Sequence, residues 1–218
     1  MRIVIAGGHG KIALLLEGLL AERGDQALAL VRNPAHLADV QNAGAEAVVC
    51  DLETASAGNV AALLSGADGV VFAAGAGPGS GIARKDSVDR AASALMAGAA
   101  EQAGVRRFVQ VSSMGAGQPP RAGSDETWAA YIAAKTAAEV DLQARDLDWT
   151  IVRPGGLTDA PATGRVRLAA PPVPSGTVPR ADVAAVIAAL LSEPRARQQT
   201  LELVSGDTPV AEAVRLLT

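Results

Sequence analysis

The sequence predicts an α/β fold, a doubly wound parallel sheet with helices on both faces, in a single domain. Three observations predict it. Strand-like and helix-like segments alternate along most of the chain. The strand-like runs are mostly apolar, as expected for parallel strands that are buried on both faces. The length of 218 residues suits one well-buried domain and is too short for two full ones. We therefore expect one Rossmann-type domain over residues 1–218.

Four strands are expected in the first half of the chain, where apolar runs end at glycine or polar residues. They cover residues 2–6, 27–31, 46–50 and 69–74. A helix opens at Lys11, a second begins at Pro34 and ends near Gly44, and a third covers residues 56–64. Proline inside the first turn and glycine after the last turn are typical helix boundaries. A flexible, glycine-rich loop is expected at residues 75–81.

The second half continues the alternation and then changes character. Helices are expected at residues 87–103 and 127–145, and strands at 105–111 and 149–153. Residues 156–180 are rich in Gly and Pro, with one expected strand at 165–169. A long irregular segment in a compact domain is usually functional. We expect it to form the lid or wall of a substrate pocket, with a structural linker as the alternative. A helix capped by Asp182, an edge strand at 201–204 and a closing helix at 209–217 follow.

Composition excludes several function classes. The net charge is −4 without a basic run, which argues against nucleic acid as a partner. Cys50 is the only cysteine, so an intramolecular disulfide is excluded and a cytoplasmic protein is expected. No signal peptide is recognisable. The longest apolar stretch, residues 183–191, is too short to span a bilayer, so no membrane partner is expected. The oligomeric state stays open.

The glycine-rich turn after the first strand predicts dinucleotide binding. Gly8, Gly10 and Ala13 fit the spacing Gly-x-Gly-x-x-Ala, and a second reading starts at Gly7. Gly7 or Gly8 forms the turn, Gly10 allows a phosphate to approach, and Ala13 allows the helix to pack on the strand. Exposed N–H groups and the positive end of the helix dipole then converge where a pyrophosphate binds.

Candidate catalytic residues lie on the fifth strand and the helix that follows it. Tyr131 is the only tyrosine, and Lys135 is four residues later, on the same face of a helix. A phenol is a weak acid at neutral pH, and a nearby cation favours its ionised form. Ser112 and Ser113 close the fifth strand, at the rim where ligands bind in such sheets. Ser113, the farther along, is the candidate for holding a carbonyl oxygen.

Arg32 indicates which cofactor is bound. It follows the second strand directly, where an acidic residue would bind the ribose hydroxyls of NAD, and an arginine there suits the 2′-phosphate of NADP. The sequence therefore predicts NADP(H) in preference to NAD(H). Asp51 and Leu52, after the third strand, either border the adenine or form an ordinary turn. Lys11 either contacts phosphate or is solvated.

Metal and hydrolase chemistry are not expected. His9 and His36 are too far apart and too isolated in the sequence for a metal site, and no other cluster has ligand spacing. No Gly-x-Ser-x-Gly elbow is present. Cys50 is expected to be a core thiol.

These pieces together resemble the atypical short-chain dehydrogenase/reductases, including the flavin/biliverdin-reductase-like and nitrogen-regulator-like proteins. The segments that carry the resemblance are IAGGHGKIA, VRNP, VSS, YIAAK and WTIVRPGGL. The resemblance implies a catalytic set of Ser113, Tyr131 and Lys135. The cofactor contacts that it implies are Gly7, Gly10, Lys11, Ile12, Arg32, Asp51, Leu52, Ala74, Gly75, Lys135 and Pro154.

The sequence departs from this group at His9, where Thr or Ser is more usual. Its C-terminal region is also shorter than in the sugar-nucleotide epimerases, which argues against large nucleotide-sugar substrates. We expect an NADPH-dependent oxidoreductase for a small carbonyl, quinone or flavin-like substrate. The alternative is a non-catalytic NADP(H)-binding redox sensor. A sensor does not need the chain's only tyrosine at position 131.

Overall fold

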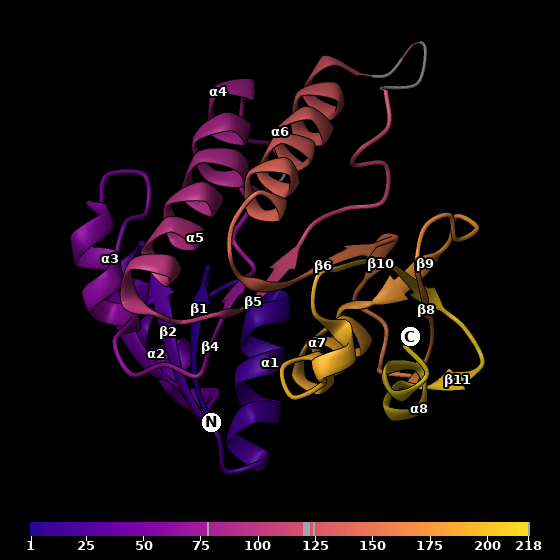
Figure 1. Ribbon diagram of the computed structural model, residues 1–218, viewed down its shortest axis with the longest axis horizontal. Coiled ribbons are helices and arrows are strands. Elements are labelled where there is room, and N and C mark those ends of the chain that lie inside the picture. The colour runs from indigo at the N-terminus through magenta and orange to yellow at the C-terminus, as the bar shows by residue number, and fades with distance from the viewer. Residues whose placement is uncertain (78, 120–122, 124, 218) are drawn as a thin grey trace.

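The fold is a large twisted sheet with helices on both faces (Figure 1). The structure is a computed structural model that describes residues 1–77, 79–119, 123 and 125–217. Within these residues the main sheet has nine strands in the order β11-β8-β10-β6-β5-β4-β1-β2-β3. The strands are β1 Arg2–Ala6, β2 Gln26–Val31, β3 Glu46–Val49, β4 Gly69–Phe72, β5 Arg107–Val111, β6 Asp148–Pro154, β8 Arg165–Ala169, β10 Gln199–Ser205 and β11 Thr208–Pro209.

Seven neighbouring strands of this sheet are parallel, in the order β3, β2, β1, β4, β5, β6 and β10. At the other edge, β8 runs antiparallel to β10, and β11 runs antiparallel to β8. The prediction of a doubly wound parallel sheet is therefore confirmed, with an antiparallel edge added. The strand order reverses between β1 and β4. Strands β2 and β3 lie on one side of β1, whereas β4, β5 and β6 lie on its other side. Such a reversal opens a crevice beyond the carboxyl ends of the strands, where ligands bind.

Each face of the sheet is covered by its own group of helices. One face is covered by α1 Lys11–Glu22, α2 Leu37–Asn42, α7 Arg180–Leu190 and α8 Val210–Arg215. The other is covered by α3 Ala57–Leu64, α5 Ala92–Ala103 and α6 Glu126–Gln143. A hydrophobic core lies on each face of the sheet, and alternate residues of β1 point into each. Ile3 and Ile5 pack into one core, and Val4 and Ala6 pack into the other. This double burial explains the almost unbroken apolar strands.

The helix expected at residues 87–103 begins earlier than its sequence suggests. It starts at Ile82 with the short α4 Ile82–Arg84, continues through a π-helical stretch, η2 Lys85–Ala91, and ends with α5. Lys85, within a charged triplet at residues 84–86, is buried. π-Helical turns are rare and occur frequently at functional sites. The preceding loop is described except for Pro78, which lies outside the described residues.

Two expectations for the C-terminal region are wrong. The strand at 201–204 is not at an edge, because β10 lies between β6 and β8. Asp182 does not cap α7; the N-cap residue is Pro179, and no side chain caps it. Asp182 is buried and accepts hydrogen bonds from the Thr163 and Gly164 N–H groups and from the Thr163 hydroxyl, at 2.7–3.1 Å. It fixes a turn far away in the sequence, which local helix signals cannot reveal.

Residues 156–180 contain more regular structure than their composition suggests. The strand at 165–169 is confirmed as β8, and β7 Gly156–Thr158 pairs with β9 Thr177–Pro179 in a separate two-stranded sheet. Asp159 connects this segment to the glycine turn, because its carboxylate lies 2.6 Å from Lys11 Nζ and 2.7 Å from an Arg180 nitrogen. None of the helices described is long and apolar enough to cross a bilayer.

Candidate functional site

The turn after β1 can be formed only by glycines at two positions. Gly7 has φ +79°, and a Cβ built on it would lie 2.6 Å from Ala74 Cα. A Cβ on Gly8 would lie 2.5 Å from Ala29 Cβ. Gly10 is the N-cap residue of α1, and no side chain caps this helix. Its first N–H groups are therefore left open to a ligand, as an anion-binding turn requires.

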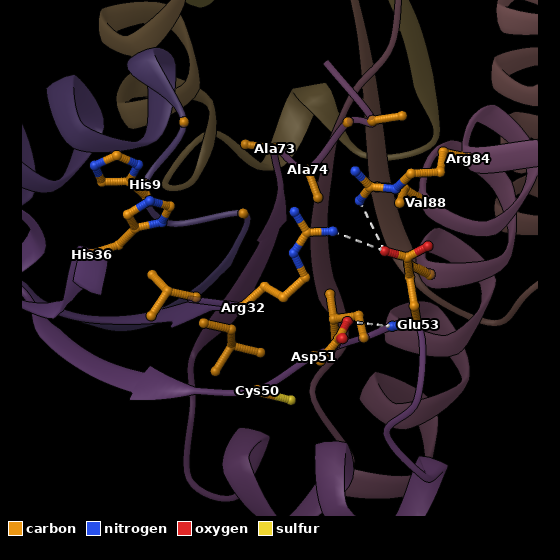
Figure 2. A pocket seen from close by; sticks show the side chains of 18 residues that line it. His9, Arg32, His36, Cys50, Asp51, Glu53, Ala73, Ala74, Arg84 and Val88 are labelled. Carbon is orange, nitrogen blue, oxygen red and sulfur yellow. Dashed lines mark hydrogen bonds and ion pairs between the residues drawn. The ribbon is translucent and has the colours of Figure 1, made fainter. Parts of the chain in front are cut away.

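A cavity of about 300 Å³ opens directly beside this turn (Figure 2). It lies at the carboxyl ends of β1 to β4, where the strand order reverses. Its size is at the lower end of the range for small-molecule sites. The predicted cofactor residues that line it are Gly7, Gly10, Arg32, Asp51, Leu52, Ala74 and Gly75. The geometry of the turn and cavity fits a dinucleotide.

Two arginines meet one carboxylate in this cavity. Glu53 lies 3.2 Å from Arg32 and 2.9 Å from Arg84, and it accepts a 2.6 Å hydrogen bond from Ser87. Figure 2 shows both guanidinium groups pointing toward Glu53 across the cavity. The Ser87 hydrogen bond, followed by those of the two arginines, holds the pKa of Glu53 below its usual value. Glu53 and Arg84 were not predicted from the sequence, where their only signal is their position near predicted loops.

His9 and His36 are neighbours in space, contrary to the expectation that they are too far apart. Their rings stack with centroids 3.6 Å apart, and His9 Nε2 lies 2.8 Å from Asp39. Both histidines line the cavity (Figure 2). Within the described residues, no group of three or more His, Cys, Asp or Glu side chains is arranged to hold a metal ion.

Cys50 lines the same cavity and is half-buried, so it is not the core thiol that the sequence suggests. Burial, with a smaller contribution from Asp51, raises the pKa of the thiol. A raised thiol pKa disfavours the reactive thiolate. Cys50 is therefore a wall residue of the cavity.

Four other predicted cofactor residues do not line this cavity: Lys11, Ile12, Pro154 and Lys135, which is described below. The Lys11 amine is paired with Asp159, and the Ile12 side chain packs against the core. Pro154 is buried at the end of β6, where its carbonyl accepts a 3.0 Å hydrogen bond from the Met114 N–H. Lys11 and Ile12 contribute their positions in the first turn of α1, where backbone N–H groups lie open.

Lys135 and Tyr131 lie on one face of α6, as predicted. Lys135 is buried, donates a 3.1 Å hydrogen bond to the Val111 carbonyl, and has its amine 5.8 Å from the centre of the Tyr131 ring. Asp89 of η2, which was not predicted from the sequence, lies 3.2 Å from the same amine and is also buried. Trp128, half-exposed, lies beside Tyr131 with ring centroids 5.4 Å apart.

The two serines at the end of β5 have different surroundings. The Ser112 hydroxyl is buried and donates a 2.5 Å hydrogen bond to Glu139, which also binds Arg153. Among the described residues, the one hydrogen bond of the Ser113 hydroxyl is a long one, 3.3 Å, to the neighbouring Met114 carbonyl. Ser112 is thus committed to a buried network, and Ser113 retains a hydroxyl available for a ligand.

Asp89 joins the lysine–tyrosine pair to the cavity. Its second oxygen accepts a 3.1 Å hydrogen bond from the Ala76 N–H, and Ala76 lines the cavity. A Cβ built on Gly75, another lining residue, would lie 3.2 Å from the Asp89 carboxylate. The end of the cavity at Gly75 and Ala76 is therefore connected through Asp89 to Lys135, whose amine lies beside the Tyr131 ring.

Comparisons with known proteins agree with this geometry. A family model described as NAD(P)H-binding matches residues 7–194. The chain is 37% identical over 218 residues, all of both chains, to a Bacillus subtilis (strain 168) protein called uncharacterized sugar epimerase YhfK. It is 34% identical to a putative NAD-dependent epimerase/dehydratase from Bacillus halodurans, covering all of both chains, with a TM-score of 0.92. ChuY, an anaerobillin reductase from Escherichia coli O157:H7, is 29% identical over 95% of this chain and 98% of that chain, with a TM-score of 0.78.

Proposed function

The chain belongs to the NAD(P)H-binding family, and on that premise we propose that it is an NADPH-dependent oxidoreductase acting on a small carbonyl, quinone or flavin-like substrate. One observation carries the proposal. The buried Asp89 connects the wall of the dinucleotide cavity to Lys135, whose amine lies against the chain's only tyrosine. A hydride donor and a proton donor are then neighbours, which is the arrangement that carbonyl reduction requires.

The preference for NADPH is supported by the two guanidinium groups in the cavity. Arg32 and Arg84 both line it, and they share the single carboxylate of Glu53. Two guanidinium groups held at one carboxylate can also bind the oxygens of a 2′-phosphate through charge-assisted hydrogen bonds. The arginine fork suits phosphate oxygens better than the neutral ribose hydroxyls of NADH.

A flat substrate is supported by the surroundings of Tyr131. Trp128 is 50% exposed, which is unusual for so large an apolar side chain, and it lies next to the Tyr131 ring. An exposed aromatic face beside a proton donor offers a stacking surface for a planar ligand. The likeness to an anaerobillin reductase supports the same class of flat, conjugated substrates.

A nicotinamide cofactor, when bound, would supply the hydride to the carbonyl carbon. The Tyr131 hydroxyl would donate a proton to the substrate oxygen, so that the carbonyl becomes an alcohol. The Ser113 hydroxyl donates a hydrogen bond to the same oxygen and stabilises the charge that develops there. Lys135 holds positive charge beside the phenol ring.

The test is turnover of NADPH with carbonyl, quinone and flavin substrates by wild type and by Tyr131→Phe. The variant keeps the ring and its packing and lacks the transferable proton. We expect carbonyl turnover to fall by a factor of about 10² to 10⁴, with NADPH affinity nearly unchanged. A flavin, reduced by direct hydride transfer, is expected to be less affected.

Two results would contradict this proposal. Full carbonyl turnover by Tyr131→Phe would exclude the tyrosine as proton donor. Tight NADPH binding by wild type without turnover of any substrate class would favour a redox sensor instead. Lys135→Ala tests whether the lysine contacts the cofactor as well as Tyr131. A loss of both cofactor affinity and turnover would indicate both contacts, and a loss of turnover alone would indicate the contact with Tyr131.

A further inference from the structure

We infer that Lys85 is a second positioning residue for the proton donor, and that its ammonium supplies the net positive charge beside Tyr131. The inference rests on the proposed function, in which Tyr131 is the proton donor. It assigns a role to a lysine outside the Tyr131–Lys135 pair, from a different helix. Lys85 acts through Tyr131 and is not proposed to touch the substrate.

Lys85 is placed against Tyr131 by the π-helical stretch η2. Its amine lies 5.3 Å from the centre of the Tyr131 ring, closer than that of Lys135 at 5.8 Å. It is buried, with 8% of its surface exposed, and donates a 2.8 Å hydrogen bond to the Gly77 carbonyl. The whole chain has three lysines, and two of them lie against its one tyrosine. Burying a lysine is costly, so this placement calls for a function.

The charge balance around the ring makes Lys85 necessary. Lys135 lies 3.2 Å from the Asp89 carboxylate, and both side chains are buried. The Asp89 carboxylate therefore offsets part of the Lys135 charge at the ring. Among the described residues, the Lys85 amine donates to a neutral backbone carbonyl and is paired with no carboxylate. Within that part of the chain, no partner offsets the Lys85 charge beside the phenol.

The charged groups in contact with Tyr131 or with its cations come from two elements. Lys85 and Asp89 belong to η2, and Lys135 belongs to α6. Arg84, the neighbour of Lys85, is turned away to Glu53. Among the described residues, these two positive charges and one negative charge leave a net charge of about +1 near the ring. Positive charge beside a phenol ring favours the phenolate over the phenol, and in our inference Lys85 supplies it.

The ionisation of Tyr131 can be measured without any substrate, because it is the only tyrosine and tryptophan does not ionise. Tyrosinate absorbance in the near ultraviolet is recorded after stopped-flow pH jumps, with no cofactor present. We expect Lys85→Gln, which removes the charge and retains a donor, to raise the midpoint by about one to two pH units. Lys85→Arg, which keeps the charge, is expected to restore most of the wild-type midpoint. Arg195→Gln, which removes an exposed charge of η3 Pro194–Ala196, is the control.

The pH profile of carbonyl turnover provides the second readout. We expect the limb that reports the proton donor to shift upward in Lys85→Gln in parallel with the tyrosinate midpoint, with kcat falling more than KM rises. Circular dichroism checks folding, and Lys85→Met provides a second neutral variant of similar length. A tyrosinate midpoint in the folded neutral variants equal to that of Arg195→Gln overturns the inference. A shifted midpoint in a protein that reduces no carbonyl supports the charge relation while refuting the proposed function.

Discussion

Glu17 predicts an unusual dependence of stability on pH. It lies on α1 beneath the glycine turn, where a Cβ built on Gly8 would approach its carboxylate to 3.3 Å. The side chain is completely buried, and neither oxygen has a hydrogen-bond partner among the described residues. Burial raises the pKa of Glu17 from 4.5 to about 8. The carboxyl group is therefore protonated in the folded protein at neutral pH.

The sign of the effect follows from proton binding in the two states. Between pH 4.5 and about 8 the folded protein holds a proton on Glu17 that the unfolded chain releases. The free energy of unfolding therefore falls as the pH rises through this window. The loss is small at pH 5 and reaches about 3 kcal/mol at pH 7, from ~1.4 kcal/mol for each unit between the unfolded pKa and the ambient pH.

The perturbation is Glu17→Gln, which matches the shape of the protonated acid and does not ionise. The variant is expected to be about as stable as wild type near pH 4.5, because both then bury a neutral polar group. At pH 7 the free energy of unfolding of the variant should exceed that of wild type by about 3 kcal/mol. The assay is urea unfolding at a series of pH values from about 4.5 to 8, with stability extrapolated to zero denaturant.

Glu22→Gln is the matched control, because Glu22 is an exposed carboxylate on the same helix. This variant should differ from wild type by less than about 0.5 kcal/mol at every pH. A difference between Glu17→Gln and wild type that stays constant over the window would refute the reasoning. It would mean that Glu17 has the same pKa in the folded and unfolded states.

Two further predictions concern the cofactor. Arg32→Ala should weaken NADPH binding by about ten- to a hundredfold, since a charge-assisted hydrogen bond contributes about 1.5–3 kcal/mol. The affinity for NADH, measured in the same fluorescence titrations, should change little. An unchanged ratio of the two affinities would contradict the assignment of Arg32 to the 2′-phosphate. Gly10→Val should abolish binding of both cofactors while circular dichroism shows an intact fold, because the side chain would occupy the pyrophosphate position at the start of α1. Normal binding by that folded variant would remove the glycine turn from the site.

Features that depend on local chemistry were predicted from the sequence. The turn at residues 7–10 was recognisable because glycine is required where φ is positive and where another backbone approaches closely, as at Gly7. Tyr131 and Lys135 were recognisable because helical spacing places them on one face. Ser113 was placed at the right end of β5 because parallel strands direct their carboxyl ends to one edge of the sheet.

The sequence by itself therefore determined the parallel sheet and the glycine turn, because apolar periodicity and glycine act through neighbouring residues. Only the tertiary structure decided which charges meet. Glu53 binds Arg32 and Arg84, and Asp89 binds Lys135, across long stretches of chain. A charged residue has the same sequence signature whether it is solvated or buried against a partner. Its burial depends on how distant segments pack, which is a property of the folded chain alone.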